Sequence, residues 1–447
     1  MTLAKITNPP RVFVIVWLSQ MISAFGTGLT SFALGVFVYL RTGSTSQFAL
    51  VLVFTVIPRM ILSPFSGALA DRRDRRQLML AADVASGLVI VLLTVLRLHG
   101  ALAVWQIYIA VGLLAIFSAL RDPAYNASVS QLVPKKQLGR ASGLVQTAEN
   151  IGEVLPPLVA GALLVAFGLS GVLIFDIISY FFGCAGLAAV RFPRLERSQA
   201  GDHAGQSSMW RDIAEGWNYI VKRRGLLQLS LLGALLCYVL GTAQILLTPL
   251  VLSFASPAVL GATFSAGGMG ILFGGIVAAA WGGFKRRVVA VIVFGLGQAV
   301  FLFIASLRPN AVIIAAGIFG YLFCVQFISN CIATILRENV PGTIQGRVFA
   351  LDRSVGMSML PLAYLLAGPL VALFRPWLVR GGALAGSAGK LIGVGQGRGI
   401  GFLFVALGVV VIAVTVISYA NPRLRHLEAE MRQSEPQEPD PELQTLG

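Results

Sequence analysis

Long apolar runs dominate the chain, and short clusters of charged and turn-forming residues separate them. The first run, residues 12–40, lies between Arg11 and Arg41 and contains no charged side chain. A helix of about 20 apolar residues is long enough to cross the hydrocarbon core of a bilayer. Charge-free runs bounded by turn residues therefore predict an all-α membrane protein with twelve transmembrane helices. The predicted spans are 12–40, 47–70, 77–97, 101–121, 141–167, 170–190, 226–252, 259–282, 288–307, 311–336, 347–374 and 400–420.

The basic residues predict how these spans are oriented. Of the 34 Lys and Arg residues, 26 lie in the two tails and the even-numbered loops, and only seven lie in the odd-numbered loops. Loops rich in Lys and Arg stay in the cytoplasm, so we expect cytoplasmic N- and C-termini. The composition agrees with a membrane protein, because 12% of the residues are charged, about half the share of a soluble protein.

Several classes of protein are disfavoured by the sequence. The net charge of +15 does not indicate a nucleic-acid-binding protein, because the basic residues mark loops and form no cluster on a soluble domain. The four cysteines lie in apolar runs without disulfide or metal-site spacing. The chain has neither a P-loop nor a nucleophile elbow. We therefore expect no enzyme, no cofactor and no metal site.

An internal repeat indicates that the twelve spans form two halves. The pattern Val-Pro-x4-Gly-Arg occurs at 133–140 and again at 340–347, and Gly161 matches Gly368 at the same offset of 207 residues. Each copy follows one apolar run and opens the next. Two six-helix halves arranged as parallel repeats are the plan of many secondary transporters.

The repeat and the charge pattern together predict four regions. Residues 1–191 form an N-terminal six-helix bundle, and residues 226–420 form the C-terminal one. Residues 192–225 form a cytoplasmic linker whose second part has the apolar spacing of an amphipathic interfacial helix. The acidic segment 421–447 is expected to be a disordered cytoplasmic tail.

The loop between the second and third spans, GALADRRDRR at 67–76, concentrates charge between two apolar runs. It resembles the signature loop of the major facilitator superfamily, Gly-x-Leu-Ala-Asp-Arg-x-Gly-Arg-Arg. Asp74 replaces the glycine of many members, a variant similar to the drug-exporter branch that holds macrolide efflux proteins and the enterobactin exporter. The matching positions are Gly67, Leu69, Asp71, Arg72, Arg75 and Arg76.

Asp71 is the candidate centre of a cytoplasmic gate. We expect it to meet the start of the eleventh span near Arg347, where free backbone N–H groups carry partial positive charge. Arg121 and the loop arginines are further candidate partners. Such a latch would hold the cytoplasmic side shut in the outward-open state; in the alternative interpretation, the loop only fixes the topology.

A second resemblance lies on the fifth span. Pro157 and Gly161 match the antiporter motif of facilitator exporters, Gly-Pro-x-x-Gly-Gly, whereas Pro156 and Ala160 replace glycines. Proline kinks a helix and frees a backbone carbonyl, and small residues allow close helix packing. We therefore expect a bend here that serves the movement of one helix bundle against the other.

Ionisable residues inside spans are costly and indicate functional sites. The candidates to carry a coupling proton are Glu149, Glu153, Asp83 and Asp176. Glu149 and Glu153 lie one helical turn apart, and two carboxylates so close in a low dielectric should not both ionise. That property suits a proton carrier. In the alternative interpretation Glu149 lies in water and Glu153 pairs with an arginine.

Arg59 is an intramembrane charge that follows Pro58 in the second span. An unpaired guanidinium at this depth would be too costly, so we expect an ion pair with a carboxylate such as Asp83 or Asp176. Contact with an anionic substrate is the alternative.

The resemblance also implies that spans one, four, seven and ten line a central cavity. Its uncharged, partly aromatic walls suit amphipathic organic molecules, although interhelical hydrogen bonds and packing explain the same residues at least as well. The candidate cavity residues are Trp17, Gln20, Phe25, Tyr108, Gln244, Gln326 and Asn330.

These features predict a monomeric secondary active transporter in the inner membrane of a bacterium. We expect it to export an amphipathic small molecule, such as a drug, a macrolide, a siderophore or a natural product, by proton antiport and alternating access. Three alternatives remain open: a small-molecule importer of the same fold, a lipid or lysophospholipid flippase, and a membrane sensor or scaffold without flux.

Overall fold

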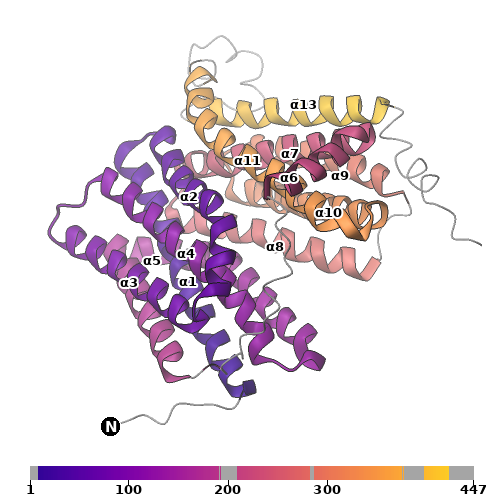
Figure 1. The fold of residues 1–447 in the computed structure, drawn as a ribbon. Helices are drawn as coiled ribbons and strands as arrows, with labels where there is room; N and C mark the ends of the chain where they lie inside the picture. The colour runs from indigo at the N-terminus through magenta and orange to yellow at the C-terminus, as the bar shows by residue number, and fades with distance from the viewer. Residues whose placement is uncertain are drawn as a thin grey trace, which may run out of the picture.

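The computed structural model describes residues 9–190, 192, 209–281, 286–374, 376 and 397–421, and in these ranges the chain folds into helices joined by short turns (Figure 1). The N-terminal helices are α1 (Pro9–Thr42), α2 (Thr45–Arg72), α3 (Arg75–Leu98), α4 (Val104–Leu132) and α5 (Leu138–Ala189). The later helices are α6 (Met209–Lys222), α7 (Arg224–Leu252), α8 (Pro257–Trp281), α9 (Arg287–Ser306), α10 (Ala311–Asn339), α11 (Gly342–Phe374) and α13 (Arg398–Ala420). The expected tail after residue 421 and most of the expected linker before α6 lie outside the described residues.

Eleven of the described helices are long and apolar enough to cross a membrane. One of them, α5, has 52 residues and is interrupted at Gly168, where φ is +65° and ψ is −171°. Glycine adopts this left-handed conformation without the steric penalty of a side chain. The break lies between the fifth and sixth predicted spans, so α5 supplies two crossings. The prediction of an all-α protein with twelve transmembrane segments is confirmed.

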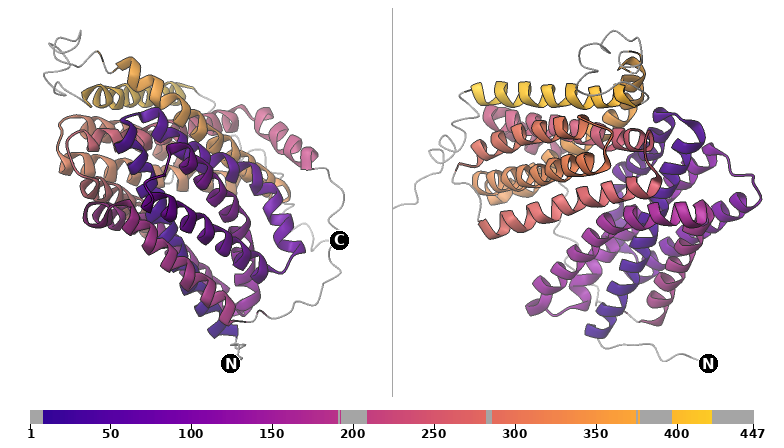
Figure 2. Two further views of the ribbon diagram at one scale, coloured as in Figure 1. Left: turned by 90° about the vertical axis from the view of Figure 1, so that its left-hand side faces the viewer. Right: turned by 180° about the vertical axis from the view of Figure 1, so that it is seen from behind.

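The helices form two groups, α1–α5 and α7–α13, whose axes lie at an angle to each other (Figure 1). The groups meet mainly where α5 packs on α8 and where α11 packs on α2. From this junction the two groups diverge, and the same arrangement is visible from two other directions in Figure 2. The chain therefore has the two-bundle architecture that the sequence repeat predicts.

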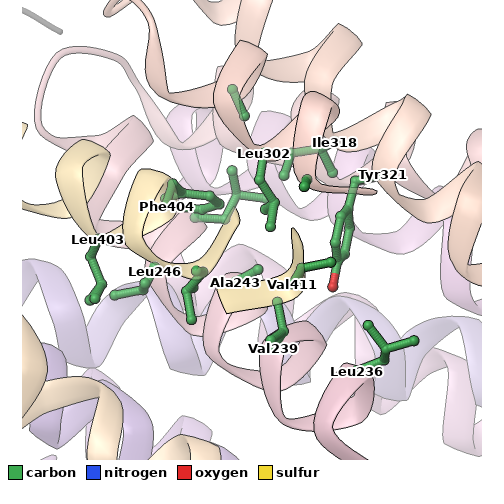
Figure 3. Close-up of a cluster of buried hydrophobic side chains, with 14 of the residues drawn as sticks. Leu236, Val239, Ala243, Leu246, Leu302, Ile318, Tyr321, Leu403, Phe404 and Val411 are labelled. Atoms are coloured by element: carbon green, nitrogen blue, oxygen red, sulfur yellow. The ribbon is translucent and has the colours of Figure 1, made fainter. Parts of the chain in front are cut away.

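The C-terminal group is built around one large apolar cluster contributed by five of its helices. Leu246 on α7, Leu302 on α9, Tyr321 on α10 and Phe404 on α13 are at most 1% exposed within it (Figure 3). Lipid tails are as apolar as these side chains, so the hydrophobic effect does not drive the helices together inside a bilayer. Dispersion contacts between close-fitting side chains hold them together instead.

The two copies of the Val-Pro pattern have the same local structure. The α4 helix ends with the Val133 N–H donating to the Val129 carbonyl at 3.1 Å, and α10 ends with the Val340 N–H donating to the Leu336 carbonyl at 3.0 Å. The proline that follows each valine lacks the N–H needed to continue the helix. The repeat thus marks equivalent helix ends in the two groups.

One predicted span boundary is wrong. The sequence interpretation ended the fourth span at residue 121 and placed Arg121 in a cytoplasmic loop. The α4 helix instead continues to Leu132, and Arg121 is only 9% exposed inside it. The helix tolerates this arginine because a buried carboxylate lies opposite it, a contact between distant segments that no local pattern reveals.

Candidate functional site

The N-terminal group contains a buried ion pair. An Nη1 atom of Arg121 on α4 lies 3.2 Å from the Asp83 Oδ1 atom on α3, and the Asp83 side chain is only 1% exposed. Gln20 on α1 donates from Nε2 to the other Asp83 oxygen at 2.8 Å. Both carboxylate oxygens are therefore satisfied, which a buried charge requires.

The charge network continues to the exposed side of α4. The second Arg121 nitrogen lies 3.4 Å from an oxygen of Asp122, whose other oxygen pairs with Arg59 on α2. The Arg59 side chain is 53% exposed. Arg59 thus pairs with a carboxylate, as expected, but the partner is Asp122 and not Asp83 or Asp176, the two candidates named from the sequence. The adjacent Arg121 and Asp122 in the sequence could have suggested Asp122 as a candidate partner.

Asp176 is the second buried aspartate of this group, and its surroundings differ from those of Asp83. It is fully buried on α5, and one of its oxygens accepts a hydrogen bond from the Ser179 hydroxyl at 3.0 Å. Within the described residues its Oδ2 atom has no hydrogen-bond partner. Among the described residues, Asp176 thus has no counter-ion like that of Asp83.

Glu149 and Glu153 lie on the first half of α5, and both are exposed in this conformation. Gln146 donates a hydrogen bond to Glu149 at 3.3 Å. No ion pair with either glutamate is seen in the part of the chain that the structure describes. The expected arginine partner of Glu153 is thus not found among these residues, and the proposed role in proton transfer stays a prediction.

Two arginines of the signature loop bind backbone carbonyls of other helices in the N-terminal group, and Arg76 binds the end of α5. Arg75 donates to the Ala127 carbonyl at 2.8 Å. Arg76 donates to the Leu187 and Ala188 carbonyls at the end of α5, at 2.7 and 3.1 Å. The last carbonyls of a helix have no intrahelical partner and carry partial negative charge, so a guanidinium stabilises them.

The loop itself is a two-residue turn between α2 and α3. Asp74 caps α3, because its side chain accepts a hydrogen bond from the Gln77 N–H at 3.2 Å. This contact explains an aspartate at the position where many family members have glycine. The expected gate contacts of Gly67, Asp71 and Arg72 lie outside the described side chains and stay predictions.

Arg347, the expected counterpart of Asp71, contacts the helix of the linker. One of its nitrogens lies 2.5 Å from a carboxylate oxygen of Glu215 on α6. Ile220 of α6 packs with Val348 and Leu336 from the facing ends of α11 and α10. The amphipathic helix of the linker is therefore docked on the C-terminal group by its apolar face.

The two groups approach each other so closely in places that only small residues fit. A Cβ atom at Gly161 on α5 would lie 2.5 Å from the Pro257 carbonyl oxygen of α8, and one at Gly261 would meet the Pro157 carbonyl. A Cβ atom at Gly368 on α11 would meet the Ser46 side chain of α2. We call the set Ser46, Pro157, Gly161, Pro257, Gly261 and Gly368 the interhalf seal.

The interhalf seal occupies one end of the molecule. Its members lie near the turn between α1 and α2, the turn between α7 and α8, the break in α5 and the end of α11. Deeper along the same face of α5, the Ser265 hydroxyl of α8 donates to the Val154 carbonyl at 2.5 Å. Gly161 and Gly368, which match in the repeat, thus make corresponding contacts with the opposite group.

The candidate cavity residues on α1 and α4 take part in packing and hydrogen bonding inside the N-terminal group. The Trp17 indole donates to the Leu144 carbonyl at 3.0 Å, and Gln20 binds Asp83 as described above. Phe25 packs against the apolar cluster of this group. Tyr108 stacks on Phe54 with ring centroids 5.6 Å apart. These contacts agree with the alternative interpretation as interhelical packing.

Among the candidate cavity residues on α7 and α10, Gln244 does lie at a cavity. Gln326 donates to Asn330 on the same helix at 3.3 Å. Gln244 is exposed and lies at a cavity of about 200 Å³ between α7, α8 and α10. Sequence reasoning missed most of the residues around this cavity, because apolar side chains facing a void have the same composition as those facing lipid. No cluster of His, Cys, Asp or Glu suited to a metal ion occurs among the described residues.

Known proteins resemble this chain over most of its length. Macrolide efflux protein A of Streptococcus pyogenes is 25% identical over 373 residues, which cover 81% of this chain and 90% of that protein. Multidrug efflux pump Tap of Mycolicibacterium fortuitum is 24% identical over 378 residues, which cover 81% of this chain and 90% of that pump. Both are similar proteins of modest identity.

A solved structure has the same fold. The inward-facing, unoccupied form of a bacterial homolog of the human lysosomal transporter Spinster aligns with a TM-score of 0.65 at 15% identity, covering 97% of this chain and 99% of that one. The model of the Major Facilitator Superfamily matches residues 16–364. With the two-bundle helical fold, this match establishes that the chain belongs to the Major Facilitator Superfamily, and is thus a multi-span membrane transporter of small molecules and not an enzyme.

Proposed function

We propose that this transporter exports amphipathic small molecules, macrolides among them, from the bacterial cytoplasm by alternating access coupled to proton entry. Support for export comes from the relatives, which are named as macrolide and multidrug efflux proteins and are covered over 90% of their length. Support for alternating access comes from one structural observation: the two groups touch at the interhalf seal and along the adjoining parts of α5 and α8, and they diverge beyond these contacts.

The distribution of Lys and Arg indicates which end of the molecule faces the cytoplasm. With both termini in the cytoplasm, the turns beside Ser46 and Pro257 face the outside of the inner membrane, and the signature loop faces the cytoplasm. The interhalf seal then closes the outer end, and the diverging helices open toward the cytoplasm (Figures 1 and 2). This is the conformation in which an exporter receives its substrate. A single chain supplies both groups, so a monomer is sufficient for alternating access.

Proton coupling requires a carboxyl group that gains and loses a proton as access alternates. Glu149 and Glu153 are exposed in this conformation and lie one turn apart on α5, the helix that also carries two members of the interhalf seal. Asp83 has Arg121 as its counter-ion in this conformation, and Asp176 has none among the described residues. The glutamate pair is therefore the first candidate for the proton carrier, and Asp176 is the second.

The test measures erythromycin uptake into inside-out membrane vesicles that hold an imposed acidic interior. We expect uptake in vesicles containing the protein and a fall to the level of empty vesicles when nigericin collapses the pH gradient. In the double variant Glu149→Gln with Glu153→Gln, uptake should fall to the same level as in vesicles without a pH gradient. Thr147→Ala, an exposed change on the same helix, is the matched control and should retain uptake.

The remaining outcomes separate the alternatives. Uptake that persists unchanged without the gradient would exclude proton coupling and leave export standing. Higher erythromycin content in intact cells that produce the protein would indicate an importer. Movement of a labelled lysophospholipid across proteoliposome membranes, without macrolide uptake, would indicate a flippase.

A further inference from the structure

The C-terminal group contains a cavity of about 200 Å³ lined by residues of three helices. Its walls are Leu240, Ala243, Gln244 and Leu247 of α7, Phe264 and Ile271 of α8, and Ile318, Tyr321, Leu322 and Val325 of α10. We call this set the C-terminal pocket. Eight of the ten residues are apolar, and none carries a charge.

The wall residues of the C-terminal pocket lie on one face of each helix, as their spacing in the sequence shows. The four residues of α7 and the four of α10 each follow the i, i+3, i+4, i+7 pattern, so each set forms one continuous face of its helix. Ala243 and Ile318 are 3% and 5% exposed and belong to the main apolar cluster, together with Tyr321 (Figure 3). The pocket is therefore a hollow beside the best-packed part of this group.

Gln244 supplies a positioned hydrogen-bond donor at the C-terminal pocket. The Tyr364 hydroxyl on α11 donates to the Gln244 Oε1 atom at 3.0 Å, and Tyr364 is only 4% exposed. This bond orients the amide, and its Nε2 atom has no hydrogen-bond partner among the described residues. Gln244 itself is exposed, so the N–H groups remain available to a ligand. Tyr321 is 1% exposed, and its hydroxyl also lacks a partner in the described part of the chain.

We propose that the C-terminal pocket binds an uncharged apolar part of the exported molecule, a ring or a branched alkyl group, next to an oxygen that accepts a hydrogen bond from Gln244. This inference rests on the proposed export function. Pockets for whole drug-sized ligands measure about 300–1,000 Å³, so this smaller cavity holds one part of the substrate. The absence of charge on its walls means that a cationic group of the substrate stays outside it, because burying an unpaired charge is costly.

The C-terminal pocket also touches the boundary between the two groups. Phe264, one of its wall residues, packs edge-to-face on Phe32 of α1 with ring centroids 5.9 Å apart and planes at 84°. A substrate group in the pocket contacts a ring that itself rests on the opposite group. The pocket is therefore placed to favour binding in one arrangement of the two groups over the other, as an alternating-access site requires.

Two substitutions test the pocket directly. Ala243→Phe fills the cavity, and Gln244→Leu removes the donor. Because Gln244→Leu also leaves the buried Tyr364 hydroxyl without its acceptor, the melting temperature of each variant is measured beside its Kd. The matched control is Leu231→Phe, which enlarges a 56% exposed side chain on the same helix. The probes are erythromycin and chloramphenicol, which are rich in hydrogen-bond acceptors, and the planar cation ethidium. Their Kd values for the purified protein in nanodiscs and their uptake into inside-out vesicles are measured together.

We expect the wild-type protein and Leu231→Phe to bind erythromycin equally. Gln244→Leu should raise the erythromycin Kd about tenfold, the equivalent of one lost hydrogen bond, and Ala243→Phe should raise it at least as much. Export of erythromycin by the wild-type protein with unchanged Kd in both pocket variants would overturn the pocket and leave the proposed function intact. Export of none of the three probes by the wild-type protein would overturn both.

Discussion

Asp83 and Arg121 are the residues that make α3 and α4 interdependent. Their side chains are 1% and 11% exposed, and Gln20 completes the hydrogen bonding of the carboxylate. Removing two charges from water costs several kcal/mol for each, and their mutual attraction offsets this cost only when both are present. Asp176, by contrast, has no counter-ion among the described residues.

This contrast predicts different effects of removing each charge. Asp83→Asn should lower the free energy of unfolding by up to about 3–5 kcal/mol, because it leaves the buried Arg121 with only its longer contact to Asp122. Asp176→Asn should lower it much less, since no partner loses a charge. The melting temperatures of the purified variants in detergent show which substitution destabilises the protein more. Adding Arg121→Met to Asp83→Asn should restore part of the lost stability. Equal melting temperatures for the two single variants would contradict the conclusion that Asp83 is stabilised by an ion pair and Asp176 is not.

At the scale of helices, α5 and α8 cross through backbone-to-backbone contact. A Cβ atom at Gly261 would collide with the Pro157 carbonyl, whereas a Cβ atom at Gly275 on the same helix would meet nothing within 4 Å. Close packing of this kind needs glycine because a methyl group would hold the helix backbones apart.

Gly261→Ala should therefore weaken closure at the interhalf seal. Overpacking of this kind costs about 1–3 kcal/mol, which disfavours the conformation described here by about 5- to 150-fold. We expect a fall of about that size in the rate of erythromycin export. Gly275→Ala is the control and should export at the wild-type rate; a similar fall in both variants would point to lower helix flexibility instead.

The helices themselves were predictable because apolar length and turn residues are local properties of the sequence. Even the break in α5 was foreseen, as the two predicted spans flank Gly168. Contacts between spans were not predictable. Arg121 was assigned to a loop because nothing local reveals Asp83 across the bundle, and Arg59 was given the wrong partner for the same reason.

The candidate cavity shows the same limit. Gln244 stood out in the sequence as a polar residue on an apolar span. Ala243 and Tyr321 did not, since their place at the hollow depends on how α7, α8 and α10 pack. The sequence predicts which helices exist, and the distances between them decide which side chains meet.

At the scale of the whole molecule, the two groups touch near one end and diverge toward the other (Figures 1 and 2). Gly368 and Ser46 belong to the touching end, on α11 and α2. If access alternates, these two residues separate in every cycle, and a covalent link between them should stop the cycle.

A cysteine pair tests this movement. A Cβ atom at Gly368 would lie 2.9 Å from the Ser46 Cβ atom, and disulfides need about 3.5–4.5 Å, so a small outward shift allows the bond. Oxidation of the variant Ser46→Cys with Gly368→Cys should abolish erythromycin export, and a reductant should restore it. Each single substitution is the control and should be insensitive to oxidant. Undiminished export by the oxidised, cross-linked pair would rule out the separation of these helices.

The buried Asp83–Arg121 pair and the uncharged C-terminal pocket lie in different halves of the chain. Under the proposed function, this separation places the candidate proton carriers in the first half of the chain and the pocket for the exported molecule in the second. Hybrids that join the first half of this protein to the second half of a relative would then inherit the energy source of one parent and the range of molecules of the other.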